Sequence, residues 1–186
     1  MTKIPSGNSF LNPQRILHDL GLKPGDKVAD LGCGGAAYFV LQAAKIVGNR
    51  GVVYGVDVLK SALSGLKSRL ALHGITNVVP VWSNVEVYKG AKRIKDNSLD
   101  YSMIINTLFQ SKDKPAMLRE AIRITAHGGR LVIIDWKTGG LTFGPNVNQL
   151  VSPQGVQNIV VGQHHLTLQR VFEPGPYHFG LVFVKE

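Results

Sequence analysis

The chain has 186 residues, of which 44% are hydrophobic and 18% charged, with a formal net charge of +9 at neutral pH and one cysteine. This length and composition predict one soluble globular domain with a full core, and the cysteine count excludes an internal disulfide. No apolar run approaches the roughly 20 residues of a membrane span, and the first ten residues lack the apolar stretch of a signal peptide. We therefore expect no membrane span and a cytoplasmic location, while the basic charge leaves a nucleic-acid partner open.

Strand-like apolar runs alternate with helix-like repeats along the first two thirds of the chain. The predicted strands are 27–31, 52–57, 78–82, 99–105 and 129–135, and the predicted helices are 13–20, 37–47, 61–73 and 114–124. Residues 85–97 are polar and basic, which predicts a loop or an irregular helix. Because strands alternate with helices, we expect these five strands to run parallel in one sheet.

The last part of the chain follows a different pattern. A loop rich in glycine and proline covers 138–150, and a short helix is predicted over 152–162. Two further strands, 166–172 and 179–184, flank Pro174–Gly175–Pro176 with no helix between them. They are therefore predicted to form an antiparallel hairpin.

Val28–Ala36, which reads VADLGCGGA, predicts a ligand site. A strand, a tight glycine turn and the start of a helix form a site for a polar, nucleotide-like ligand. Asp30 places a carboxylate at the end of the strand, where it would repel a pyrophosphate but attract an ammonium group. This favours S-adenosylmethionine over a dinucleotide.

Every other predicted parallel strand also ends in polar residues. Asp57 ends the second strand, and its carboxylate can accept both hydroxyls of a ribose. Asn84 follows the third strand and can read an adenine edge through its amide. Asn106 follows the fourth strand and Asp135 ends the fifth. Because parallel strands place their carboxyl ends on one edge, we expect a single crevice there.

Four segments carry a family resemblance: VADLGCGGA, VVYGVD, NSLDYSMIINTLF and RITAHGGRLVIIDW. In this order they resemble the class I S-adenosylmethionine-dependent methyltransferases, in particular the small-molecule branch that includes ubiquinone/menaquinone and arsenite methyltransferases. The resemblance covers about residues 10–186. It implies an α/β, Rossmann-like, seven-stranded and mostly parallel sheet, ordered 3-2-1-4-5-7-6, with strand 7 antiparallel and helices on both faces. The chain is expected to be one methyltransferase domain, 1–186, with a helical lead-in over 1–22 and the C-terminal hairpin over 166–186.

The resemblance also implies roles for individual residues. The residues implied to bind the cofactor are Asp30, Gly32 and Gly34 at its methionine end, Asp57 at the ribose, Val58, Asn84 and Val85 at the adenine, and Asn106 with Leu108 beside the amino acid moiety. Two positions depart from the family pattern. Ala36 replaces the third glycine, and Ser83–Asn84 replaces the usual acid after the third strand.

The predicted reaction is methyl transfer from S-adenosylmethionine, leaving S-adenosylhomocysteine, to a small-molecule acceptor in preference to a nucleic acid. Such a reaction needs orientation and at most a base, so we expect no metal. Candidates for the base are Asp135, Tyr177 and His178. His164 and His165 are adjacent, which is poor spacing for joint metal ligation.

Three alternatives stay open. The first is an RNA- or protein-directed methyltransferase that uses its basic surface, including the lysines and arginine of 85–97. The second is a nicotinamide-dependent oxidoreductase, because residues 32–37 also fit GxGxxA. The third is a non-catalytic S-adenosylmethionine-binding protein, because the acid near position 84 is missing.

Overall fold

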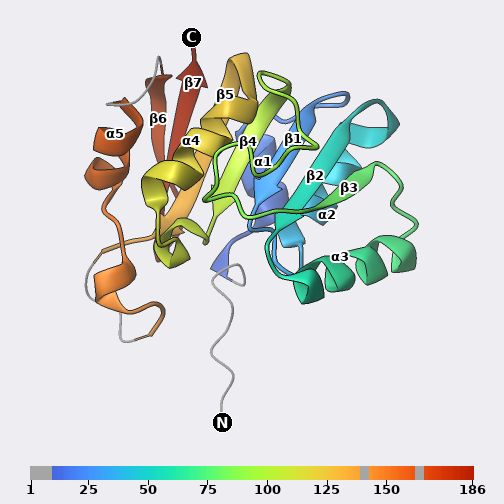
Figure 1. Ribbon diagram of the computed structural model, residues 1–186, viewed down its shortest axis with the longest axis horizontal. Coiled ribbons are helices and arrows are strands. Elements are labelled where there is room, and N and C mark those ends of the chain that lie inside the picture. Colours follow the sequence, from blue (N-terminus) through green and yellow to red (C-terminus); the bar gives the residue numbers. More distant parts are fainter. Residues whose placement is uncertain (1–9, 139–142, 162–165) are drawn as a thin grey trace.

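The structure is a computed structural model that describes residues 10–138, 143–161 and 166–186. Seven strands form one sheet in the order β3-β2-β1-β4-β5-β7-β6 (Figure 1). They are β1 Lys27–Leu31, β2 Val52–Asp57, β3 Val78–Trp82, β4 Leu99–Ile105, β5 Thr125–Trp136, β6 Leu166–Gly175 and β7 His178–Lys185. The first five strands run parallel, and β7 runs antiparallel to both β5 and β6. The predicted fold class and strand order are confirmed.

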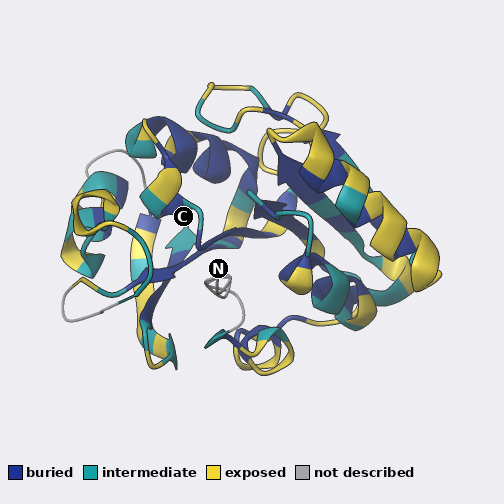
Figure 2. Ribbon diagram, turned by 90° about the horizontal axis from the view of Figure 1, so that it is seen from below, coloured by how far each residue is buried: buried dark blue, intermediate teal, exposed yellow. Residues whose placement is uncertain are grey.

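Helices cover both faces of the sheet, with their inner sides buried and their outer sides exposed (Figure 2). The α-helices are α1 Pro13–Asp19, α2 Tyr38–Val47, α3 Lys60–Leu72, α4 Lys114–Ile124 and α5 Pro153–Val161, with short 3-10 turns at Gly48–Arg50, Leu108–Gln110 and Val147–Gln149. The first three helices share a core with Val28 and Met103, and the last two share a core with Leu31 and Ile133. Val28 and Leu31 both belong to β1. Because side chains alternate between the two faces along a strand, residues three apart point to opposite faces, and so the two cores lie on opposite faces of the sheet.

The start of two helices can be explained by side-chain caps. Asn12 accepts a hydrogen bond from the Arg15 backbone N–H at 3.0 Å, and Pro13 occupies the first turn of α1. Asp113 caps α4 in the same way through the N–H of Ala116 at 2.9 Å. These caps satisfy N–H groups that have no partner within the helix. The five predicted helices agree with the observed ones to within one residue at each end.

Two strands are longer than predicted. β5 begins at Thr125 rather than at residue 129, and β6 continues to Gly175 rather than ending at residue 172. The added part of β5 is mostly not buried, and the ladder with β4 shifts register between Leu99 and Tyr101. A strand end that is partly exposed and irregularly paired contains no run of apolar residues. The apolar pattern of the sequence therefore does not predict it.

The segment between β3 and β4 contains no helix, and α4 holds it in place. Glu120 is fully buried and accepts hydrogen bonds from the backbone N–H groups of Lys89 at 2.8 Å and Ala91 at 2.9 Å. Arg123 is ion-paired with Glu120 at 2.7 Å and donates to the carbonyl of Ile94 at 3.0 Å. The buried charges are therefore paired and fully used for hydrogen bonding, which fixes the loop that begins at the end of β3.

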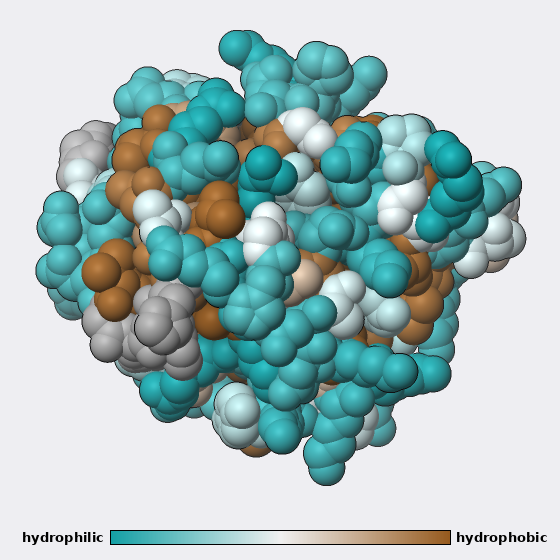
Figure 3. All heavy atoms as spheres, turned by 90° about the horizontal axis from the view of Figure 1, so that it is seen from above, coloured by the Kyte–Doolittle hydropathy of each residue, from teal (hydrophilic) through white to brown (hydrophobic). Residues whose placement is uncertain are grey.

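None of the described helices is long and apolar enough to cross a membrane. Figure 3 shows the end of the molecule opposite the carboxyl ends of the parallel strands, where hydrophilic residues cover most of the surface between smaller hydrophobic areas. The basic side chains of the β3–β4 loop, Lys89, Lys92, Arg93 and Lys95, are exposed.

Candidate cofactor site

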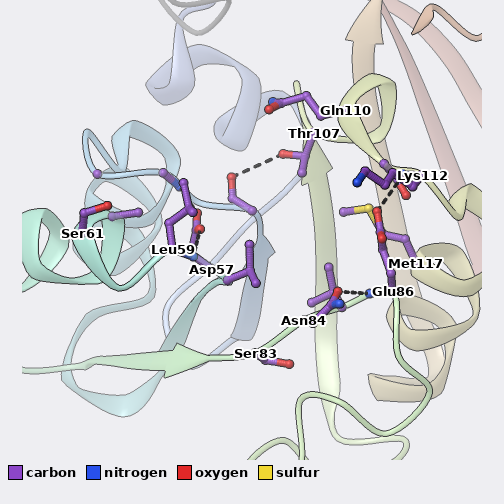
Figure 4. Close-up of a pocket in the computed structure, with 17 residues that line it drawn as sticks. Asp57, Leu59, Ser61, Ser83, Asn84, Glu86, Thr107, Gln110, Lys112 and Met117 are labelled. Atoms are coloured by element: carbon purple, nitrogen blue, oxygen red, sulfur yellow. Dashed lines mark hydrogen bonds between the residues drawn. The ribbon is translucent and has the colours of Figure 1, made fainter.

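A cavity of about 750 Å³ opens at the carboxyl ends of β1 to β4 (Figure 4). Its volume lies within the range of small-molecule sites, and its position is where open α/β sheets bind ligands. Six predicted cofactor residues line it: Gly32, Gly34, Asp57, Val58, Asn84 and Val85. The predicted residues Asp30, Asn106 and Leu108 do not line it.

The glycine turn after β1 forms one wall of the cavity. Gly32 has φ +83°, and a Cβ there would lie 2.3 Å from Cγ2 of Thr107. The backbone N–H groups of Gly32 and Cys33 both donate to the carbonyl of Val56, at 2.8 and 3.0 Å, which ties the turn to β2. Only glycine fits this position without strain or collision. Ala36 has no positive φ, so its replacement of the family's glycine adds no backbone strain.

Asp57 is held in a fixed orientation by two backbone donors. Its Oδ2 accepts from the N–H of Gly34 and its Oδ1 from the N–H of Leu59, both at 2.9 Å (Figure 4). The residue is 8% exposed and lines the cavity. A carboxylate oxygen can accept more than one hydrogen bond, so each oxygen retains capacity for a ribose hydroxyl.

Asp30 lies on β1 below the glycine turn and has a different environment. It is 3% exposed, and its Oδ1 has no hydrogen-bond partner among the described residues. Burial, and after it the charge of Asp57, raises the pKa of Asp30 to about 7. Burial, and after it these two carboxylates, also raises the pKa of the Cys33 thiol, which argues against a nucleophilic thiolate. An unpartnered buried carboxylate fits a site that receives a cationic ligand group.

The part of the cavity wall that follows β3 contains a lining residue that the sequence prediction missed. Asn84 lines the cavity, and its Oδ1 accepts from the N–H of Glu86 at 2.9 Å. This oxygen retains capacity for a second hydrogen bond, and the amide N–H groups can donate to a ligand. Glu86 also lines the cavity, and its Oε1 accepts from the N–H of Lys112 at 2.8 Å. The pKa of Glu86 is lowered chiefly by the nearby Ser111 hydroxyl, and also by the backbone N–H groups of Lys112 and Asp113. Glu86 is the one acid between residues 83 and 94, a signal that could have identified it.

Asn106 and Leu108 follow β4 but lie beneath the surface of the site. Asn106 is 8% exposed with φ +52°, and its N–H donates to the carbonyl of Ile134 at 2.8 Å. Leu108 is fully buried. Thr107 and Gln110 of the same segment line the cavity instead. The role of Asn106 beside the amino acid moiety stays a prediction.

None of the three candidate bases lines the cavity: Asp135 lies near the end of β5, and Tyr177 and His178 lie at the start of β7. Asp135 accepts from the N–H groups of Trp136 at 2.8 Å and Phe109 at 3.1 Å, and burial raises its pKa to about 6. His178 is fully buried, and neither of its ring nitrogens has a hydrogen-bond partner in the part of the chain that the structure describes. Burial, followed by the charge of Lys137, lowers the pKa of His178 to about 4.

Aromatic rings pack against two of these candidates, Tyr177 and His178. The ring of His178 lies 4.5 Å from that of Trp136, between centroids. Tyr177 packs edge-on against Phe10 at 5.2 Å and against Phe143 at 4.9 Å. These rings pack against one another. The sheet edge at β5 and β7 is therefore closely packed, whereas the edge at β1 to β4 opens into the cavity.

No group of three or more histidine, cysteine or acidic residues suited to a metal occurs in the described part of the chain. His164 and His165 lie outside the described residues.

Comparison with known proteins defines the class. The model of the methyltransferase domain family matches residues 22–159, so the chain belongs to that family. It is 34% identical over 116 residues to the ubiquinone/menaquinone biosynthesis C-methyltransferase of Shewanella frigidimarina, an alignment that covers 62% of this chain and 45% of that protein. The chain thus matches slightly under half the length of this curated relative.

Solved structures agree with this assignment. The chain is similar to an S-adenosylmethionine-dependent methyltransferase from Aquifex aeolicus, with a TM-score of 0.86, 27% identity and coverage of 98% and 94% of the two chains. An arsenic (III) S-adenosylmethionine methyltransferase from Chlamydomonas reinhardtii has the same fold, with a TM-score of 0.69, 20% identity and coverage of 89% and 65%. The resemblance to class I S-adenosylmethionine-dependent methyltransferases is confirmed, and the nicotinamide alternative loses its support.

Proposed function

We propose that this chain transfers the methyl group of S-adenosylmethionine to a small-molecule acceptor. The observation that carries the proposal is the paired arrangement of carboxylates around the glycine turn. Asp57 is oriented by two backbone N–H groups, and Asp30 is buried without a partner for its Oδ1. This arrangement suits a ligand with a diol at one end and a cation at the other.

In this proposal the protein mainly binds and orients. Asp57 accepts the two ribose hydroxyls, Val58 covers one adenine face, and the Asn84 amide with the Glu86 carboxylate meets the adenine edge. Gly32 and Gly34 let the backbone approach the methionine arm, and Asp30 neutralises its ammonium group. When bound, the cofactor supplies an electrophilic methyl group on a positively charged sulfur. The chain's task is to align an acceptor with that methyl group and exclude water.

The acceptor half of the site is proposed at the ends of β4, β5 and β7. Among the candidate bases, His178 suits a hydrogen bond to an acceptor best, because both of its ring nitrogens are unpartnered and the lowered pKa keeps it neutral. Asp135 already has hydrogen-bond partners, since each of its oxygens accepts one backbone N–H, although each oxygen retains capacity for one more. The curated relatives are named for ubiquinone and menaquinone biosynthesis, so quinol-type ring compounds are the first acceptors to test.

The test has two stages. Isothermal titration with S-adenosylmethionine and S-adenosylhomocysteine should give saturable binding, and no binding up to millimolar ligand would contradict the proposal. Transfer of a radiolabelled methyl group is then measured on quinols, other small metabolites, total RNA and protein extract. Labelling of RNA or protein alone would favour the alternative in which the exposed basic loop binds the acceptor.

A second candidate, a non-catalytic cofactor-binding protein, is favoured by the packed rings around His178. Cofactor binding without transfer to any of these acceptors would support it. The cytoplasmic location and the single-domain organisation over 1–186 stay predictions.

A further inference from the structure

One carboxylate of the proposed cofactor site lies among groups that offer it no positive charge. Asp30 is 3% exposed, and its Oδ1 has no hydrogen-bond partner. The titratable groups facing it are Asp57 on β2 and the Cys33 thiol in the glycine turn. Its strand partners, Gly55 on β2 and Met103 on β4, are uncharged. An ionised Asp30 would therefore meet both desolvation and repulsion from Asp57.

The two carboxylates differ in their local partners. Each oxygen of Asp57 accepts a backbone N–H, from Gly34 and from Leu59. No such donor reaches the Oδ1 of Asp30. Within the described residues, Oδ1 of Asp30 therefore has room for a donor that a ligand could supply.

We propose that Asp30 is protonated in much of the free protein near neutral pH and gives up this proton when the cofactor binds, so that cofactor uptake is coupled to proton release. The inference rests on the proposed function, because it requires the ammonium group of a cofactor amino acid arm close to Asp30. Binding of adenosine or ribose alone would not release the Asp30 proton, because neither carries an ammonium group.

The carboxylic acid of Asp30 becomes a carboxylate, its proton passes to the buffer, and the ligand's ammonium supplies the compensating charge. Burial and the charge of Asp57 hold the pKa of Asp30 at about 7 in the free protein, and a neighbouring cation lowers it again. Because free α-amino groups titrate near pH 8, the ligand is already cationic at about pH 6 and takes up little of that proton itself.

Calorimetry of the full chain with S-adenosylhomocysteine counts these protons. The titration is run at about pH 6 in phosphate and in bis-Tris, whose ionisation heats differ, so the difference in observed heat gives the number of protons exchanged. We expect close to one proton released per ligand, and an affinity that rises roughly fivefold between about pH 6 and about pH 7.

Two controls assign the proton. 5′-Methylthioadenosine lacks the amino acid arm and should bind the wild-type chain with no proton release, a comparison that needs no variant. Asp30→Asn should bind S-adenosylhomocysteine more weakly, with no proton release and similar affinity at both pH values. Proton release that persists in either control would assign the proton to another group and overturn the proposal.

The remaining outcomes separate the two proposals. If S-adenosylhomocysteine binds at about pH 6 with no proton release, the coupling is wrong and the proposed function stands. If it does not bind at either pH, both proposals fail.

Discussion

The two halves of the sheet's carboxyl edge are built differently. At β1, β2 and β3 the glycine turn leaves an open cavity whose central carboxylate, Asp57, is oriented by two backbone donors. At β5 and β7 the rings of Trp136, Tyr177 and His178 lie within an aromatic cluster, and Asp135 is occupied by its own backbone contacts. The cofactor half is thus preformed, whereas the proposed acceptor half must rearrange before an acceptor can reach it. Preformed sites bind ligands with a smaller entropic cost of ordering the protein. Cofactor binding should therefore be less sensitive to substitutions than acceptor binding.

Gly32→Ala should have the largest effect. The new Cβ would lie 2.3 Å from Thr107 in a backbone with φ +83°, so strain and collision together should cost about 2–5 kcal/mol of unfolding free energy and abolish cofactor binding. Gly144→Ala is the matched change in the other half, since Gly144 has φ +104° and its Cβ would meet the Trp136 ring at 3.2 Å. We expect it to cost about 1–2 kcal/mol and to leave cofactor affinity nearly unchanged. Urea unfolding and calorimetry measure both, and equal losses of affinity would remove the distinction between the halves.

Asp57→Asn should have the second largest effect on cofactor binding. Removing the charge and one acceptor weakens contacts to both ribose hydroxyls, so affinity for S-adenosylmethionine should fall about 100-fold or more. Asp135→Asn is a close control, because Asp135 is also buried and also accepts two backbone N–H groups. Its affinity should stay within about threefold of the wild type. A similar loss in both variants would show that the effect arises from general disturbance of the edge.

Asp30→Asn should stabilise the free protein at alkaline pH. Because the pKa of Asp30 is raised from 3.8 to about 7, the folded state binds more protons than the unfolded state between these values, and stability falls as pH rises through this window. Asp30→Asn has no carboxyl group to ionise at this position, so it does not lose this stability. Its melting temperature should exceed that of the wild type by a few degrees at about pH 8, and the gain should vanish near pH 4. A variant less stable than the wild type at about pH 8 would contradict the buried, unpaired state of Asp30.

Glu86→Gln should have the smallest effect. If the carboxylate accepts the adenine amino group, loss of its charge should weaken S-adenosylhomocysteine binding roughly three- to tenfold, or about 1 kcal/mol. Glu173→Gln changes an exposed acid that pairs with Lys137 near the acceptor half, and it should leave the affinity unchanged. Unchanged affinity in Glu86→Gln would remove Glu86 from the adenine contacts.

Sequence reasoning recovered the elements that depend on local pattern. Apolar runs located the strands, and the position of Asp57 after β2 was enough to predict a residue that lines the cavity. The order of the strands came from the family resemblance, since no local pattern encodes it. Contacts between distant segments were missed. Glu120 and Arg123 hold a loop about thirty residues away, and Glu86 reaches the cavity from that loop. The packing of the rings around His178 was equally invisible, because it joins residues from both ends of the chain.

A crystal structure with S-adenosylhomocysteine bound tests the preformed cofactor site most directly. We expect both ribose hydroxyls to lie within hydrogen-bond distance of the Asp57 carboxylate, which keeps its contacts to the N–H groups of Gly34 and Leu59. A ligand seated elsewhere, or an Asp57 turned away from the ribose, would contradict it.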